Sequence, residues 1–391
     1  MSGVGRVLLR TIGGQVRVGS LTVRDPDGVV HTFGGTAAGP RAGVTLRDWS
    51  LLTGLATTGA IALADGWIAE TFDSPDLPAL IELSTLHLER EHRRLPAWIE
   101  RPGQALWRAI GRSWAPRGPI TDMAQHYDLG NEFYSLWLDE TMTYSSAFFT
   151  DPSMSLKDAQ CEKYRRLAAS TGIERGMRVL EIGSGWGAFG AYLAGDLGCD
   201  VTTLTISKEQ AAHVDELIAR RGLGDRYRVL LQDFESSSGR FDAVVSVEMI
   251  ESIPGSRWPA FFRVLHDRLE PGGRVGLQSI VVADRHWRDS NANPDFVRRY
   301  IFPGGQVPAP GVLRASAERV GLEWLGEEWF GQSYARTLAT WHRNFDAAWD
   351  RIAPLGFDRR FQRMWQYYLS YTEGGFRAGR VDVGQVVLGR R

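Results

Sequence analysis

The sequence has very few cysteines and no long apolar run. Its 391 residues include two cysteines, Cys161 and Cys199, which are too few for a disulfide framework and do not have a metal-ligand spacing. The most apolar stretch, residues 51–70, is interrupted by glycines, threonines and Asp65, whereas a bilayer span needs about 20 apolar residues. These absences argue against a disulfide-rich, a metal-binding and a membrane-spanning protein.

An excess of charge of one sign is also missing. The formal net charge is −1, so no overall field attracts nucleic acid or an anionic membrane, and any such attraction must be local. The start of the chain lacks the charged segment followed by an apolar one that is typical of secretory signals. We therefore expect a cytoplasmic protein that binds no nucleic acid.

Residues 1–92 are predicted to form an amino-terminal unit without a catalytic set of residues. Apolar and polar residues alternate on both sides of the Asp-Pro-Asp-Gly sequence at residues 25–28, which predicts a β-hairpin. Residues 45–70 and 73–88 place apolar side chains at helical spacing. The unit is therefore expected to mix strands and helices.

A basic linker is predicted at residues 93–120. Residues 93–117 hold six arginines, one glutamate and the tryptophans Trp98, Trp107 and Trp114. Arginine binds lipid phosphates and indole rings favour the membrane interface, so this composition is typical of a segment on a phospholipid surface. A solvated interdomain helix that packs through its tryptophans is the alternative.

From residue 121 to residue 391 the pattern alternates between β and α. An apolar run at residues 177–183 is typical of a strand buried on both faces. Ser207 followed by Gln210 predicts the capping box of a helix that ends near Gly222. Further strands are expected at 200–206, 227–233, 241–248 and 274–282. The pattern predicts an open parallel sheet wound on both faces, with its ligand at the carboxyl ends of the first strands.

A glycine-rich loop follows the first of these strands, with glycines at 183, 185 and 187. Such a loop lets a ligand approach the main chain closely, but alone it fits a dinucleotide, an adenosyl cofactor or a tight turn. Glu181 lies where a carboxylate can meet an amino-acid ammonium, and Trp186 suits the flank of a sulfonium cation. No acidic residue ends the second strand, where the ribose of a dinucleotide would need one. These details favour S-adenosylmethionine over a nicotinamide cofactor.

Several ordered motifs resemble one enzyme family. They are EIGSGWG, TLTISKEQ, QHYDLGNEFYSLWLDETMTYSSAFF, VVSVEMIES, RYIFPGG and YYLSYTEGGFRAGRVDVGQVV. Together they resemble the cyclopropane-fatty-acyl-phospholipid synthases, of which the mycolic acid cyclopropane synthases are close relatives. The resemblance implies an α/β fold with a class I methyltransferase Rossmann-like doubly wound sheet and a smaller amino-terminal α+β lipid-associated domain. It also implies transfer of a methyl(ene) group from S-adenosylmethionine to a cis double bond of a phospholipid acyl chain, giving a cyclopropane ring.

The resemblance also implies a set of cofactor-binding residues. Core packing is the alternative role for Tyr127, and closure of the capping box is the alternative for Gln210. The set is Tyr127, Tyr144, Gly183, Gly185, Trp186, Gly187, Thr205, Ser207, Gln210, Gln232 and Asp233.

Alkylation of an alkene leaves a carbocation, so the reaction needs a dry site, aromatic faces and a base for the departing proton. In relatives, this base is a bicarbonate ion. The resemblance maps its ligands onto Glu251, Tyr334, Ile280, Ser146 and Gln278. Ser146 stands where the family usually has cysteine and Gln278 where it has histidine; a glutamine donates a hydrogen bond but cannot share a proton with the anion, which puts bicarbonate in doubt.

Glu248 lies three residues before Glu251. The two carboxylates could divide acid and base work, or Glu248 could only orient a loop or the cofactor. The VEMIE and GLQ sequences also resemble actinobacterial relatives that leave a methylene branch instead of a ring. A small-molecule N- or O-methyltransferase and a non-catalytic binding protein are further alternatives.

The expected partners are unsaturated phospholipid acyl chains at the inner face of the membrane, to which the protein would bind peripherally. A homodimer is left open by the sequence.

Overall fold

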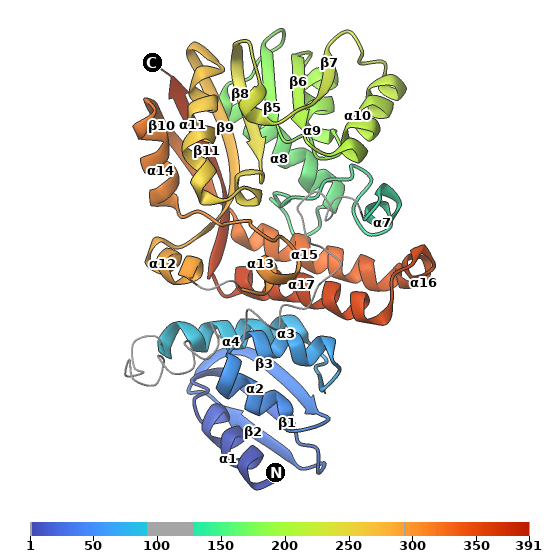
Figure 1. Cartoon of the computed structure of the whole chain (residues 1–391), viewed down its shortest axis with the longest axis vertical. Coiled ribbons are helices and arrows are strands. Elements are labelled where there is room, and N and C mark those ends of the chain that lie inside the picture. The colour runs from blue at the N-terminus through green and yellow to red at the C-terminus, as the bar shows by residue number, and fades with distance from the viewer. Residues whose placement is uncertain (1, 92–128, 293–294, 391) are drawn as a thin grey trace. The chain divides into compact units, whose positions relative to one another are not determined.

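The structure, a computed structural model, describes residues 2–91, 129–292 and 295–390. The chain divides into two compact units (Figure 1), one made of residues 1–119 and 346–380 and the other of residues 120–345 and 381–391. Tyr127 and the predicted linker at 93–120 lie outside the described residues. Among the helices of the described part, none combines the length and apolar content needed to cross a bilayer.

The amino-terminal unit is built on a four-stranded sheet with the order β2-β1-β3-β4. The predicted hairpin is confirmed, since β1 (Val18–Arg24) and β2 (Val30–Gly34) pair antiparallel. The Asp25 carboxylate fixes the turn by accepting the main-chain N–H groups of Asp27 and Val29 at 3.0 and 2.9 Å. The remaining elements are α1 (Ser2–Gly13), β3 (Ala37–Leu46), α2 (Ser50–Thr58), α3 (Ile61–Ile68), β4 (Phe72–Asp73) and α4 (Leu77–Glu91).

A helix from the far end of the chain completes this unit. Helix α17 (Arg359–Arg377) follows the short helix α16 (Trp349–Ile352) and packs on α3 and α4. A side chain at Gly374 would place its Cβ 2.7 Å from Ile81, so the close approach of α17 to α4 requires glycine there. The sequence assigned residues 121–391 to one methyltransferase domain, whereas these contacts group residues 346–380 with the amino-terminal unit.

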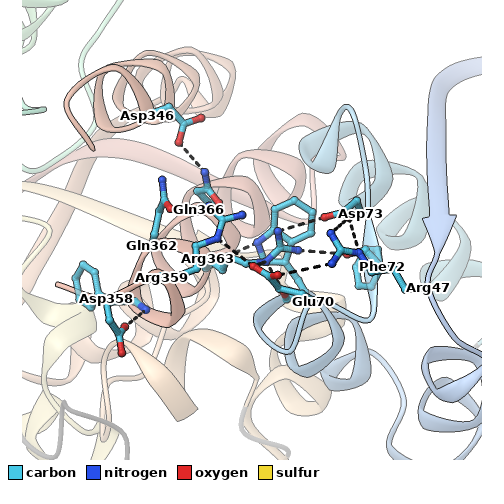
Figure 2. A network of polar contacts seen from close by, with 12 residues as sticks. Arg47, Glu70, Phe72, Asp73, Asp346, Asp358, Arg359, Gln362, Arg363 and Gln366 are labelled. Carbon is cyan, nitrogen blue, oxygen red and sulfur yellow. Dashed lines mark hydrogen bonds and ion pairs between the residues drawn. The ribbon is translucent and has the colours of Figure 1, made fainter. Parts of the chain in front are cut away.

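Arg363 joins α17 to the end of α3 and to β4 (Figure 2). Its guanidinium donates to the main-chain oxygens of Trp67 and Phe72 at 2.5 and 3.2 Å and to Asp73 at 3.2 Å. It also lies over the Trp67 ring, 3.8 Å from the centroid. Only 3% of the side chain is exposed, so water cannot replace these contacts.

We expect Arg363→Met to lower the stability of the amino-terminal unit by about 3 kcal/mol, because it leaves two carbonyl oxygens without their buried donor. Arg359→Met is the matched control, since Arg359 lies on the same helix with 62% of its side chain exposed; it should cost less than about 1 kcal/mol. Scanning calorimetry of the thermal transitions measures both changes. Equal destabilisation by the two variants would contradict the role of Arg363.

The second unit carries a seven-stranded sheet with the order β10-β11-β9-β8-β5-β6-β7. The five predicted parallel strands are confirmed, and β11 is antiparallel to both β9 and β10, an extension that the sequence pattern did not reveal. The strands are β5 (Arg178–Ile182), β6 (Asp200–Thr205), β7 (Tyr227–Leu231), β8 (Phe241–Val247), β9 (Leu269–Val282), β10 (Leu322–Trp329) and β11 (Val381–Arg390).

Alternate side chains of the central strands enter two different cores. Val179 and Val245 pack with α8 (Leu156–Thr171), α9 (Ala188–Ala191) and α10 (Lys208–Arg221). Leu180 and Val244 pack on the other face with α11 (Trp258–Asp267) and α14 (Pro310–Arg319). The sheet is therefore covered by helices on both faces, as the apolar strands predicted.

The other helices of this unit are α7 (Asn131–Ser135), α12 (Asp284–Ala292), α13 (Phe296–Tyr300) and α15 (Gly331–Ala347), whose last two residues are grouped with the first unit.

Candidate active site

The glycine-rich loop joins β5 to α9. Gly183, Gly185 and Gly187 all have positive φ, at 94°, 48° and 88°. A Cβ at Gly183 would lie 3.1 Å from Met249, and one at Gly187 would lie 3.0 Å from Val214. A Cβ at Gly185 would meet nothing within 4 Å, so this glycine leaves its main chain facing an open space.

That space belongs to a cavity of about 340 Å³ at the carboxyl ends of β5, β6, β7 and β8. Most of the predicted cofactor residues line it. They are Tyr144, Gly183, Gly185, Trp186, Thr205, Ser207, Gln210, Gln232 and Asp233; Gly187 is not in the lining and is the N-cap residue of α9.

Hydrogen bonds hold the β6 side of the cavity in place. Ser207 caps α10 by accepting the Gln210 N–H, as the capping box predicted. The Gln210 side chain does not close the box; its Oε1 accepts the Thr205 hydroxyl at 2.8 Å. At the next strand, both oxygens of Asp233 accept from Arg257, at 2.9 and 3.0 Å.

Glu181 supplies a carboxyl group at the floor of the cavity. Only 2% of the residue is exposed, and its Oε2 atom has no hydrogen-bond partner among the described residues. Burial raises the pKa of this group to about 8. A buried acid with an unpartnered oxygen is suited to a cationic ligand group such as the ammonium of S-adenosylmethionine, because the added cation favours the ionised carboxylate.

Aromatic rings form one wall of the site. Trp186, whose indole N–H donates to Asn131 at 2.7 Å, lies with its ring 4.7 Å from that of Tyr134. Tyr134 in turn contacts Tyr144, and Tyr144 contacts Trp341 with ring centroids 5.3 Å apart. The sequence did not assign a role to Tyr134, although it lies in an aromatic-rich motif. Of these rings, those of Trp186 and Tyr144 line the cavity, where their π faces suit a positively charged group.

The carboxylate of Glu248, at the end of β8, accepts three hydrogen bonds. Its Oε1 accepts the Ser146 N–H at 2.9 Å and the Gln278 amide at 2.8 Å, and its Oε2 accepts the Tyr334 hydroxyl at 2.8 Å. Glu248 also lines the cavity, whereas Ser146, Gln278, Tyr334 and Glu251 do not. Its φ of +49° is unusual for a residue with a side chain and costs about 1–2 kcal/mol. Such strain is typical of functional positions.

The protonation of Glu248 is set by opposing effects. Burial is the largest effect and leaves the pKa of Glu248 above its usual value, although the Lys163 ammonium and the three hydrogen-bond donors act to lower it. Lys163 is completely buried, also lines the cavity, and donates to the Ser145 hydroxyl at 2.7 Å. Burial lowers the pKa of Lys163 to about 7. The sequence did not predict a role for this residue, although it is one of three lysines among 45 basic residues.

Glu251 turns toward β9 instead of the cavity. Its Oε1 accepts the Ser279 hydroxyl at 2.8 Å and the main-chain N–H of Ile280. Its Oε2 is buried without a partner among the described residues. Burial, together with the Glu248 carboxylate, raises the pKa of Glu251 to about 8, so at neutral pH this group favours the protonated acid.

These contacts do not fit a bicarbonate ion at the positions that the resemblance assigned. The Ser146 N–H, Gln278 and Tyr334 already donate to Glu248, and the Ile280 N–H already donates to Glu251. An added anion would find its donors occupied and would lie against a carboxylate. In this structure the carboxylates of Glu248 and Glu251 accept the hydrogen bonds that the resemblance assigned to the anion.

A doubly wound sheet with a glycine-rich first loop, a buried acid and an aromatic wall defines an S-adenosylmethionine-dependent methyltransferase. Residues 116–386 match the family described as mycolic acid cyclopropane synthetase. The chain belongs to that family.

Several characterised proteins are similar to this chain. Tuberculostearic acid methyltransferase of Mycobacterium tuberculosis is 34% identical over 90% of this chain and 84% of its own length. The cyclopropane-fatty-acyl-phospholipid synthase of Escherichia coli K12 is 36% identical over 68% of this chain and 67% of its own. The crystal structure of a mycolic acid cyclopropane synthase complexed with SAH and CTAB matches with a TM-score of 0.64 and 29% identity, covering 69% of this chain and 99% of the other.

We expect Gly185→Ala to raise the Kd for S-adenosylhomocysteine at least tenfold, because its methyl group would enter the cavity. Gly222→Ala is the matched control: Gly222 also has a positive φ, of 64°, and open space around its Cβ, but it ends α10 and does not line the cavity. Both variants carry a similar backbone strain, so a comparable fall in Tm is expected. Titration calorimetry measures the binding, and equal Kd values for the two variants would contradict the placement of the cofactor.

Proposed function

We propose that this protein transfers a methyl group from S-adenosylmethionine to the cis double bond of a phospholipid-bound acyl chain, with Glu248 as the base, and that it leaves a methylene branch. The observation that carries the proposal is the Glu248 carboxylate, which accepts three hydrogen bonds and faces the cofactor cavity. Similarity to a tuberculostearic acid methyltransferase over 90% of the chain supports a branched product. Similarity to the E. coli synthase supports a phospholipid substrate.

When bound, S-adenosylmethionine supplies an electrophilic methyl group on a sulfonium. The π electrons of the alkene form the new C–C bond, and the C–S bond breaks to leave a neutral thioether. The cation then forms on the neighbouring alkene carbon. Tyr144, which lines the cavity and packs against the Trp341 ring, is suited to stabilise that charge through its π face.

The product depends on the next reaction of this cation. If a hydride moves from the methylated carbon to its cationic neighbour, loss of a proton from the new methyl group gives a C=CH₂ branch. If no hydride moves, loss of a methyl proton with closure of a C–C bond gives a cyclopropane ring. In both cases a base must accept one proton, and we assign that role to Glu248.

A built-in carboxylate performs this step without a diffusible base. Its hydrogen bonds from Ser146, Gln278 and Tyr334 keep it oriented, and they lower its pKa against the effect of burial. The base must be ionised to act, so the rate should fall as the pH decreases through the pKa of Glu248.

We expect Glu248→Gln to reduce kcat at least about 10³-fold, because an amide cannot accept the proton, with the Kd for S-adenosylhomocysteine within about threefold of wild type. Glu251→Gln makes the same chemical change three residues away and should reduce kcat less than about tenfold, because its oxygen can still accept from Ser279 and Ile280. The assay measures lipids that gain 14 Da in vesicles of unsaturated phospholipid.

Both products have the same mass, so the test needs a second step. Catalytic hydrogenation adds 2 Da to a methylene branch under mild conditions that leave a cyclopropane ring intact. A product that resists hydrogenation would support the ring and contradict the proposed branch. Full activity in Glu248→Gln would overturn the assignment of the base, whatever the product.

A further inference from the structure

The side chain of Gln278 has two ends of similar shape and opposite hydrogen-bonding character. Its Oε1 accepts hydrogen bonds and its Nε2 donates them, so only one of two orientations supports the Glu248 carboxylate. The residue is fully buried, and its orientation is therefore set by neighbouring protein groups. The Ser146 carbonyl and an ionised Glu248 only accept, so they favour the orientation in which Nε2 faces them, whereas a protonated Glu248 can also donate. The contacts at the Oε1 end therefore determine how firmly this orientation is held.

Gln385 contacts the other end of this side chain. It lies on β11 directly opposite Gln278 of β9 in the sheet register, and it is 3% exposed. Its Nε2 donates to the main-chain oxygen of Lys163 and to the Oε1 atom of Gln278, both at 3.1 Å. Both protons of the amide nitrogen are thereby used.

The main-chain oxygen of Lys163 determines which way the Gln385 and Gln278 side-chain amides are oriented. A peptide carbonyl only accepts, so the Nε2 atom of the Gln385 amide must face it. The same Nε2 atom of Gln385 also donates to Oε1 of Gln278, so Oε1 must face Gln385. The Nε2 atom of Gln278 then points the other way and donates to Glu248 at 2.8 Å and to the Ser146 oxygen at 3.3 Å. The reverse orientation would set the Gln278 oxygen against a carboxylate and a carbonyl.

We propose that Gln385 is a positioning residue for the reaction: anchored on the Lys163 carbonyl, it fixes the orientation in which Gln278 donates to Glu248. The inference rests on the proposed role of Glu248 as base. Gln385 does not line the cavity, so its effect on the reaction passes through Gln278.

Loss of Gln385 should change the ionisation of Glu248. A donor to the carboxylate favours its charged form, so loss of an ordered donor raises the pKa of Glu248. The other charged or titratable groups that act on this carboxylate are the Lys163 ammonium from α8, the Tyr334 hydroxyl from α15 and Glu251 from the turn after β8, and the Ser146 N–H also donates to it. The Gln385 substitution changes none of these side chains; it removes a hydrogen bond to the Lys163 main-chain oxygen, while the Lys163 ammonium keeps its contact with Ser145.

The test compares Gln385→Met, which keeps the side-chain length and removes the amide, with wild type in the vesicle assay. We expect kcat to fall about tenfold at neutral pH, the acid limb of the kcat–pH profile to move to higher pH, and KM and the Kd for S-adenosylhomocysteine to stay within about twofold. Leu388→Ala, a buried change on the same strand, controls for destabilisation: it should lower Tm without moving the acid limb.

A double-variant cycle identifies the route of the effect. If Gln385 acts through Gln278, Gln278→Met and the double variant Gln278→Met/Gln385→Met should have the same kcat. Additive losses, or an unmoved acid limb in Gln385→Met, would overturn the positioning role. Failure of the proposed function looks different, because then wild type would form no lipid product or Glu248→Gln would retain its rate.

Discussion

The catalytic unit is organised around one enclosed carboxylate. Glu248 is held by donors from three separate places in the chain: the Ser146 main chain, the β9 residue Gln278 and the α15 residue Tyr334. Ionised carboxylates are costly away from water unless they are hydrogen-bonded, so these segments must meet at one point for the group to be tolerated. Its left-handed backbone conformation adds a cost that packing elsewhere offsets.

The two neighbouring glutamates differ in environment more than in sequence. Glu248 has three donors and a nearby ammonium, while Glu251 has two donors, an unpartnered oxygen and a carboxylate neighbour. Burial raises the pKa of both groups; the Lys163 ammonium opposes that rise at Glu248, whereas the Glu248 carboxylate adds to it at Glu251. In the proposed reaction this difference assigns proton acceptance to Glu248 and gives Glu251 the role of holding the β9 main chain at Ile280.

Much of the fold follows from the sequence because its signals are local. The apolar strand at 178–182, the Ser207 cap and the glycines at 183, 185 and 187 each depend on a few adjacent residues. The antiparallel strand β11 and the packing of α17 on α4 depend on contacts between residues about 100 to 300 positions apart, and no local pattern encodes them. The site divides in the same way: the cofactor loop was predictable, whereas the roles of Lys163 and Gln385 depend on three-dimensional neighbours.

The orientation of the Glu248 side chain toward the cavity is the feature of the site that the sequence could least predict. The spacing of two glutamates in VEMIE indicated a shared site, but of the two only Glu248 lines the cavity, and it does so from a backbone position with positive φ. A single sequence rarely reveals a positive φ at a residue other than glycine.

The central claim is that a side chain of this protein takes the place of bicarbonate. Its most direct measurement is the initial rate of lipid methylation by the wild-type protein in carbon-dioxide-free buffer, with and without added bicarbonate at constant pH and ionic strength. The account predicts the same rate in both conditions. A rate that collapses without bicarbonate and returns when bicarbonate is added would contradict it.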